Sequence, residues 1–329
     1  MTSALEIVGQ YTAGIESELA RYLPRTGEPD EFYSSIWDLL DRGGKRFRPA
    51  LVFLACECVG GARENAVAAA AAVELLHNMT LVHDDIEDES ELRRGKPCIH
   101  RIYGVPIAIN AGDAMLIKVF DIANSAPIAE ELRHRLVAQI AKRAYEITWG
   151  QAFEFSMRER KRFSEDEVIQ LLRFKTGALT RLSLEAGAIS GDASPRELEA
   201  LGEFGETVGV GFQIVDDVLN VQGDVKKYGK EIGGDIREGK KTVLAAHLLR
   251  VAKPADRKAF ASLLGNKRIT VSGIRKAIAL YAKYGSIQYA MNQAKLYSER
   301  SKKALDTVPV SNARNSLATI AEFLVSRSF

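Results

Sequence analysis

The stretch AVAAAAAVELLHNMTLVHDDIED, residues Ala66–Asp88, decides the fold. It is rich in alanine, and its apolar residues fall on more than one side of a helix. A helix that is apolar on several sides is normally buried at the centre of a bundle. We therefore predict one long central helix that ends in a run of acidic residues.

The remainder of the chain also follows the helical period. The stretch Asn312–Ser326 places its apolar residues on one stripe, and Ser194-Pro195 predicts a helix start with Ser194 as the N-cap. No series of short alternating runs separated by turn dipeptides is present, which argues against a sheet protein. No linker rich in proline and serine divides the chain. We therefore predict an all-α fold, a single-domain helical bundle over residues 1–329.

Composition excludes several classes of protein. The chain has 45 Lys and Arg against 43 Asp and Glu, and this near-balance gives no reason to expect nucleic-acid binding. The cysteines Cys56, Cys58 and Cys98 form no CxxC motif and are interpreted as buried thiols in a reducing compartment. The apolar run Ala66–Val73 is closed by Glu74 and is shorter than the roughly 18 residues of a membrane span. With no signal pattern at the N-terminus, we expect a soluble, cytoplasmic protein without a transmembrane segment.

The first candidate site is the acidic run at the end of the central helix, with Asp84, Asp85 and Asp88. Asp84 and Asp88 are four residues apart and share a helix face. Carboxylates this close repel one another unless cations neutralise them, and Mg²⁺ shared with a substrate phosphate is the natural partner. A solvated helix end is the alternative, because Asp-Asp pairs also occur by chance.

The second candidate site is formed by Gln213, Asp216 and Asp217, which share one helix face in apolar surroundings. Carboxylates inside an apolar helix are costly unless they are paired or bound to metal. We therefore predict that the two acidic helices form two walls of one cavity that holds several Mg²⁺ ions.

Basic and polar side chains suited to phosphate oxygens accompany both acidic clusters. They lie on the turn Gly43–Pro49, on the central helix and after it, in an apolar helix, and in the glycine-rich segment Gly223–Lys241. We expect this last segment to be a mobile loop and not a packed element. A surface charge is the commoner explanation for any one of them, but their joint arrangement favours a diphosphate site. The residues are Lys45, Arg48, His77, Arg93, Arg94, Lys175, Thr176, Lys230 and Lys240.

Together these segments resemble the trans-prenyltransferases, the isoprenyl diphosphate synthases of the polyprenyl synthetase family. The run around His77 is most similar to archaeal geranylgeranyl diphosphate synthases. The resemblance covers nearly the whole chain and implies an isoprenoid synthase fold around a deep central cavity, usually as a homodimer. It rests on Gly44–Pro49, His77–Asp88, Arg93–Gly95, Lys175-Thr176, Gly211–Asp217, and Lys230 before Asp235.

The resemblance also implies a role for each residue. Lys45, Arg48, His77 and Arg94 would bind the diphosphate of isopentenyl diphosphate. Asp84, Asp85, Asp88 and Asp216 would hold three Mg²⁺ ions on the allylic diphosphate, which Arg93, Lys175, Lys230 and Lys240 would contact. Thr176 and Gln213 would turn oxygen dipoles toward the allylic cation. The acidic motif that includes Asp217 ends in Asn220, where the family typically has Asp.

The implied reaction is a Mg²⁺-dependent, head-to-tail condensation of isopentenyl diphosphate with an allylic diphosphate. Closure of Gly223–Lys241 would exclude water from the allylic cation. Met79 and Thr80, just before Asp84, are expected to set product length, and we expect geranylgeranyl diphosphate (C20), with C25 or longer products as the alternative. A non-catalytic subunit of a heteromeric synthase would lack parts of the metal set. A class I terpene cyclase would lack the isopentenyl site.

Overall fold

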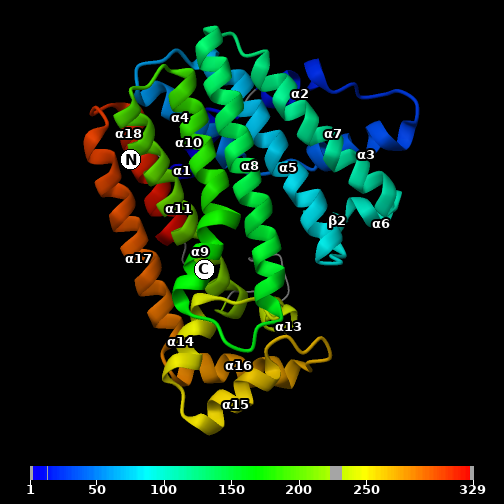
Figure 1. Cartoon of the computed structure of the whole chain (residues 1–329), viewed down its shortest axis with the longest axis vertical. Coiled ribbons are helices and arrows are strands. Elements are labelled where there is room, and N and C mark those ends of the chain that lie inside the picture. The colour runs from blue at the N-terminus through cyan, green and yellow to red at the C-terminus, as the bar shows by residue number, and fades with distance from the viewer. Residues whose placement is uncertain (1–2, 13, 223–231, 327–329) are drawn as a thin grey trace. The chain divides into compact units, whose positions relative to one another are not determined.

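The computed structural model describes residues 3–12, 14–222 and 232–326 (Figure 1). These residues form an all-α fold, as predicted from the helical period. Their only strands are the two-residue β1 (Leu92–Arg93) and β2 (Lys96–Pro97), which pair antiparallel. The chain divides into two compact units, so a single domain over residues 1–329 stays a prediction. Unit 1 comprises residues 1–144, 181–202 and 304–320, and unit 2 comprises residues 145–180, 203–303 and 321–329.

Unit 1 is organised around the helix predicted from the alanine-rich stretch. Its complete elements are α1 (Ala4–Gly9), α2 (Ile15–Tyr22), α3 (Asp30–Asp41), α4 (Phe47–Cys58), η1 (Arg63–Ala66), α5 (Val67–Glu87), α6 (Ile99–Tyr103), α7 (Val105–Asn124) and η3 (Leu305–Thr307). The division between the units falls within α8 (Glu130–Arg158), α10 (Ala178–Ser190), α11 (Pro195–Gln222) and α18 (Asn312–Ser326). Helix α11 begins at Pro195, and the Ser194 hydroxyl accepts a hydrogen bond from the Glu197 amide at 3.3 Å, which confirms the predicted start.

Helix α5 packs against α2, α4 and α7 (Figure 1). Its alanines are fully buried, and small side chains allow neighbouring helices to approach closely. At Gly112 of α7, an added Cβ atom would lie 2.2 Å from His83 Nε2, so a larger residue there would displace the His83 ring. The predicted short run Ala66–Val73 lies within the longer stretch Arg63–Glu87, which by length and composition alone is apolar enough to cross a membrane. However, 72% of its most apolar window is buried, as in the core helix of a soluble protein.

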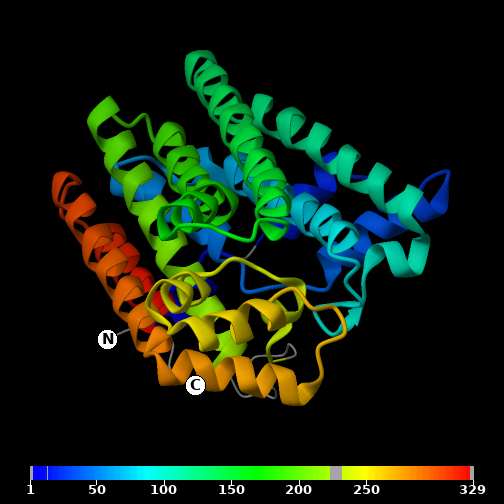
Figure 2. The same cartoon turned by 60° about the horizontal axis from the view of Figure 1, so that its bottom comes forward.

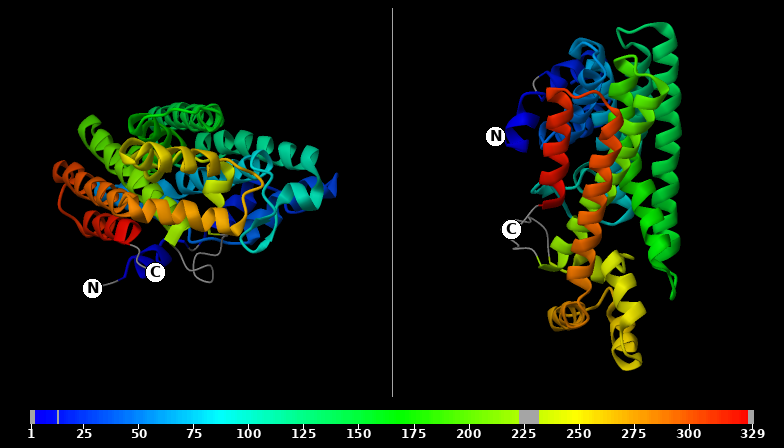
Figure 3. Two further views of the ribbon diagram at one scale, coloured as in Figure 1. Left: turned by 90° about the horizontal axis from the view of Figure 1, so that it is seen from below. Right: turned by 90° about the vertical axis from the view of Figure 1, so that its left-hand side faces the viewer.

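Unit 2 contains a π-helical turn and a set of short helices. Its complete elements are α9 (Glu165–Leu172), the π-helix η2 (Arg173–Gly177), α13 (Gly234–Glu238), α14 (Val243–Val251), α15 (Pro254–Leu263) and α16 (Val271–Lys283). Helix α17 (Ser286–Ala304) also belongs to unit 2, except for its last residue, Ala304. Helices α14, α15 and α16 pack against one another, in yellow and orange in Figures 2 and 3. Helix α13 lies inside the predicted loop Gly223–Lys241, and its Ile236 is buried, so this part of the segment is a packed element.

Candidate diphosphate and metal sites

The first acidic cluster lies at the C-terminal end of α5 in unit 1. Asp84 and Asp85 belong to the last turn of the helix, and Asp88 is its C-cap residue. Asp85 is buried and accepts a hydrogen bond from Arg93 Nε at 3.0 Å. Arg93 Nη2 lies 3.6 Å from Asp84 Oδ2. Arg93, which the resemblance assigns to the allylic diphosphate, is therefore an ion-pair partner of the acidic motif in this structure.

Several cations of unit 1 surround His77 of α5. Burial and the charges of Arg48, Arg94, Arg93 and Arg46 hold the pKa of His77 well below its ordinary value, so its imidazole is neutral at pH 7. Arg48 Nε is buried and has no hydrogen-bond partner among the described residues, and burial lowers the pKa of the Arg48 guanidinium. Three of the four predicted isopentenyl diphosphate ligands thus form one cationic cluster. Such a cluster suits an anion that supplies the missing acceptor.

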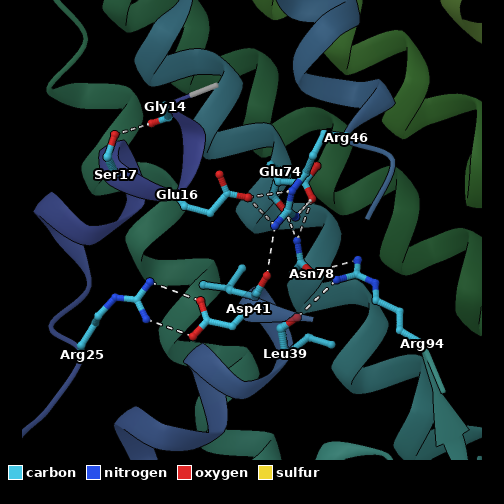
Figure 4. A network of polar contacts seen from close by, with 11 residues as sticks. Gly14, Glu16, Ser17, Arg25, Leu39, Asp41, Arg46, Glu74, Asn78 and Arg94 are labelled. Carbon is cyan, nitrogen blue, oxygen red and sulfur yellow. Dashed lines mark hydrogen bonds and ion pairs between the residues drawn. The ribbon is translucent and has the colours of Figure 1, made fainter. Parts of the chain in front are cut away.

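A buried polar network supports this cluster, and the sequence analysis missed it (Figure 4). Arg46 donates to Glu74, to Glu16 at 2.8 Å and to the carbonyl of Leu40 at 3.0 Å. Asn78 Nδ2 donates to Glu74 Oε1 at 3.1 Å, and Asn78 Oδ1 accepts from Arg94 Nη2 at 3.3 Å. Glu74 interrupts a long apolar run, and that isolated carboxylate was the signal that a buried cation had to be nearby.

Lys45 is exposed and lines a cavity of about 290 Å³ beside the turn Gly43–Pro49. The other lining residues are Leu5, Val8, Gly9, Thr12, Glu16, Gly43, Gly44 and Arg46. None of the predicted acidic residues lines this cavity, so it is not the deep cavity expected for a growing prenyl chain. That deep cavity, and the pairing of the two acidic helices as its walls, stay predictions.

In unit 2, Lys175 and Thr176 lie on the π-helix η2, which interrupts the helical path between α9 and α10. π-Helical turns are rare and frequent at functional sites. An added Cβ atom at Gly150 of α8 would lie 2.7 Å from the Lys175 amide nitrogen, so a glycine is needed opposite this turn. Lys175 Nζ lies 2.5 Å from the buried Glu154 carboxylate, and the charges of Lys175, Lys240 and Arg158 lower the pKa of Glu154 against the opposing effect of burial.

Thr176, Gln213 and Asp217 form a chain of hydrogen bonds. The Thr176 hydroxyl donates to Gln213 Oε1 at 3.0 Å, and Gln213 Nε2 donates to Asp217 Oδ1 at 3.1 Å. Both polar residues that the resemblance assigns to the allylic cation are therefore bonded to each other. This chain fixes the orientation of the Gln213 amide beside the second acidic motif.

The carboxylates of the second acidic motif are crowded. Asp217 is 7% exposed, and burial with the nearby charges of Asp235 and Asp216 raises its pKa well above its ordinary value. Lys240 Nζ lies 3.5 Å from Asp235 Oδ1 and 3.0 Å from Glu238 Oε2. Lys240 is thus held by carboxylates near the motif, whereas Lys230 lies outside the described residues, and the contact of either lysine with the allylic diphosphate stays a prediction.

Asn220, the departure from the family motif, has a structural role. Its Oδ1 accepts a hydrogen bond from the Asp235 amide at 3.1 Å, and its carbonyl accepts from the Gly233 amide at 2.7 Å. Both bonds hold the start of α13 against the end of α11. An amide oxygen performs this task as well as a carboxylate does, and it adds no further negative charge beside Asp217.

The donor sets fit a hard cation only when substrate oxygens complete the coordination. Within the described part of the chain, no three His, Cys, Asp or Glu side chains converge on a metal position. Burial is the main cause of the raised pKa of Asp217, and the charges of Asp235 and Asp216 add to it, so a bound cation would favour the carboxylate form of this residue. Mg²⁺ prefers oxygen ligands and is commonly held by one or two carboxylates together with substrate phosphates.

The two residues expected to set product length lie one after the other on α5. Met79 is buried at 7% exposure, and Thr80 donates its hydroxyl hydrogen bond to the carbonyl of His77 at 2.8 Å. Because its hydroxyl is occupied by its own helix, Thr80 presents mainly its methyl group to its surroundings. Both side chains can therefore act as apolar surface.

The chain is similar in sequence and in fold to known isoprenyl diphosphate synthases. A short chain isoprenyl diphosphate synthase of Methanothermobacter thermautotrophicus is 35% identical over 327 residues, which cover 99% of each chain. A geranylgeranyl diphosphate synthase of Saccharolobus solfataricus is 40% identical over 293 residues, 88% of each chain. The crystal structure of a geranylgeranyl pyrophosphate synthetase from Pyrococcus horikoshii has a TM-score of 0.93 and 38% identity, and covers 99% of this chain and 98% of that one. Residues 29–281 match the polyprenyl synthetase family, to which the chain therefore belongs as a trans-prenyltransferase.

Proposed function

We propose that this protein condenses isopentenyl diphosphate with an allylic diphosphate, head to tail, and releases geranylgeranyl diphosphate as its main product. The observation that carries this proposal is the cationic cluster around His77, where Arg48 Nε lacks an acceptor. A diphosphate supplies several charged acceptor oxygens to such a cluster, and arginine binds them with paired donors. Lys45, Arg48, His77 and Arg94 are the proposed ligands of isopentenyl diphosphate.

The acidic residues are proposed to serve the allylic substrate. Asp84, Asp85, Asp88 and Asp216 would hold Mg²⁺, three ions in all, and the bound ions would neutralise the charge of the departing diphosphate. Arg93, Lys175, Lys230 and Lys240 would contact the same diphosphate. In this proposal Lys175 exchanges its hydrogen bond with Glu154 for one with the substrate, because the Glu154 carboxylate and the diphosphate are both anions that compete for the same ammonium group.

The bonds that change belong to the substrates. The C–O bond of the allylic diphosphate breaks, and the double bond of isopentenyl diphosphate attacks the resulting allylic cation. A proton is then lost to the released diphosphate. The protein's own part is to bind both diphosphates, to orient the Gln213 oxygen through Thr176 and Asp217, and to exclude water from the cation.

Product length, assembly and location complete the proposal. Met79 and Thr80 would limit the product to twenty carbons, with a C25 product as the alternative. A homodimer is supported by the exposed apolar side chains of α7, where Val105, Ile109 and Ile117 are exposed at 43%, 43% and 68%. Several large exposed apolar residues on one helix favour contact with a protein partner. We place the enzyme in the cytoplasm.

One experiment tests the proposed function. The purified protein is incubated with Mg²⁺, labelled isopentenyl diphosphate and, in turn, each allylic starter, and the chain length of the products is measured. We expect C20 as the main product and no condensation after chelation of Mg²⁺. Absence of condensation with every starter would instead favour the non-catalytic subunit of a heteromeric synthase.

A further inference from the structure

Glu74 is a buried carboxylate that lies among the proposed diphosphate ligands without being one of them. It is 3% exposed, and it lies on α5 one helical turn before His77. Its carboxylate accepts hydrogen bonds from the guanidinium of Arg46 and from the amide of Asn78 (Figure 4). Two chains of contacts therefore begin at Glu74, and each ends at the cationic cluster.

The first chain leads through Arg46 to the turn that carries Lys45 and Arg48. Arg46 has a backbone φ of 49°, a left-handed conformation that residues other than glycine rarely adopt. Its guanidinium holds this conformation by donating to Glu74, Glu16 and the carbonyl of Leu40. Arg46 is the N-cap residue of α4. Its conformation therefore sets the direction of the chain at Lys45, just before the helix, and the orientation of the first helical turn, which carries Arg48.

The second chain leads through Asn78 to Arg94. Asn78 is fully buried, and its amide donates to Glu74 while its Oδ1 accepts from Arg94 Nη2 at 3.3 Å. Arg94 Nη1 donates to the carbonyl of Leu39 at 3.2 Å, and the backbone of Arg94 is also left-handed, with φ of 54°. The Glu74 carboxylate fixes which way the Asn78 amide faces, since only the oxygen side of that amide can accept from Arg94.

The charge of Glu74 acts on the cluster as well. It raises the pKa values of Arg46, Arg48 and Arg94 against the lowering effect of burial. Without this carboxylate, less negative charge would offset the repulsion between the guanidinium groups, and the arginine side chains would move apart. One carboxylate among these arginines still leaves positive charge for a ligand.

We propose that Glu74 is a positioning residue for the isopentenyl diphosphate site, acting on Lys45 and Arg48 through Arg46 and on Arg94 through Asn78. This inference rests on the proposed function, which assigns those three cations to isopentenyl diphosphate. It predicts a selective effect: loss of the Glu74 charge weakens isopentenyl diphosphate and leaves the allylic substrate largely unaffected.

The test is the substitution Glu74→Gln, which keeps the size of the side chain and removes its charge. Calorimetric titration with isopentenyl diphosphate alone should show a Kd raised about tenfold or more, as expected when a charged hydrogen-bond network is broken. The KM for isopentenyl diphosphate should rise with it. The KM for the allylic diphosphate, and kcat at saturation with both substrates, should stay within about threefold of the wild-type values.

Glu185→Gln is the matched control. Glu185 is also a buried carboxylate of unit 1, 2% exposed, and it is bound by Arg143 at 2.6 Å and by the amide of Gln139. Its substitution removes a comparable buried ion pair that does not contact the cluster, so the ratio of the two KM values should remain that of the wild type. If Glu185→Gln changes the ratio of the two KM values as much as Glu74→Gln does, then Glu74→Gln acts through general destabilisation and the proposal is overturned.

Asn78→Leu keeps the test decisive if Glu74→Gln does not fold, because it removes the link to Arg94 without leaving a buried charge unpaired. It should also raise the Kd for isopentenyl diphosphate selectively. If the wild-type enzyme condenses its substrates but the folded variants bind isopentenyl diphosphate as tightly as the wild type does, the positioning role of Glu74 is overturned. A wild-type protein that neither binds nor condenses isopentenyl diphosphate would overturn the proposed function itself.

Discussion

Glu74 of unit 1 and Glu154 of unit 2 are both buried carboxylates among cations, but they hold those cations differently. Glu154 pairs directly with Lys175, which is a proposed ligand of the allylic diphosphate. Glu74 instead pairs with Arg46 and reaches the proposed ligand Arg94 only through Asn78. A buried carboxylate can thus compete with the substrate diphosphate for a cation, as Glu154 does for Lys175. It can also orient a cation indirectly and leave it available to the diphosphate, as Glu74 does for Arg94.

The two units also show the same electrostatic effect with opposite sign. In unit 1, burial and neighbouring arginines hold His77 in its neutral form. In unit 2, burial and neighbouring carboxylates raise the pKa of Asp217 and favour its neutral form. Burial is the larger cause in both cases, and the neighbouring like charges add to it, so a bound anion would offset the charges around His77 and a bound cation those around Asp217.

The largest expected effect comes from deleting a carboxylate of either acidic motif. Asp84→Ala or Asp216→Ala should lower kcat by at least about a hundredfold, because charge on the departing diphosphate is then poorly neutralised. Steady-state kinetics at saturating Mg²⁺, with circular dichroism to confirm the fold, measures this. The exposed Asp166→Ala serves as control, and near-normal turnover in both folded variants would contradict the assignment.

Separate loss of one cation from each unit should distinguish the two diphosphate sites. Arg48→Ala should raise the KM for isopentenyl diphosphate about ten- to a hundredfold, the value of a charged hydrogen bond. Lys175→Ala should instead impair the allylic substrate, in its KM or in the rate of its ionisation. Measurement of both KM values in each variant decides the matter, and a rise of only the allylic KM in Arg48→Ala would mean that the two assignments are exchanged.

A moderate effect is expected on product length from the buried Met79 of unit 1. Met79→Ala removes several atoms and should allow longer products, whereas Met79→Phe should shift the distribution toward fifteen carbons. Chromatography of the dephosphorylated products compares the two variants with the wild type. Identical distributions would show that another element limits the chain, for which Leu116 and Phe120 of α7 are the candidates.

The smallest expected effect is on the pH dependence of stability. His77 has its ordinary pKa, near 6.5, in the unfolded chain and a lower pKa in the native protein. At pH values between these two, the unfolded chain binds a proton at His77 that the native protein does not. The free energy of unfolding should therefore decrease as pH falls below about 6.5, by at most about 1.4 kcal/mol per pH unit for this residue. His77→Gln should show a shallower decrease in urea unfolding between pH 7.5 and 5.5.

His100 and His247, whose pKa values are also lowered by burial, contribute equally to both proteins in that comparison. Saturating inorganic diphosphate should reduce the pH dependence of the wild type, because a bound anion offsets the arginine charges around His77. Equal slopes for wild type and variant would indicate that the arginines do not act on this imidazole.

Local sequence determined the helices and the residue types of both sites. The alanine-rich period of Ala66–Asp88 predicted α5, and Ser194-Pro195 predicted the start of α11, because propensity and capping act within one turn of the chain. Spacing and charge singled out the acidic and basic residues, and the resemblance to the family then assigned a role to each of them. The packed helix α13 was missed, because many charges and glycines in Gly223–Lys241 are typical of a loop.

Only the tertiary structure decided how the charged groups are paired. Arg46 meets Glu74 across 28 sequence positions, and Lys175 meets Glu154 across 21. The π-helix around Lys175 depends on a glycine of another helix, Gly150. Such contacts depend on which helices pack together and how closely, so periodicity along one helix carries no information about them. The sequence by itself therefore determined which chemistry is present, and packing determined which cations are held and which remain available to a ligand.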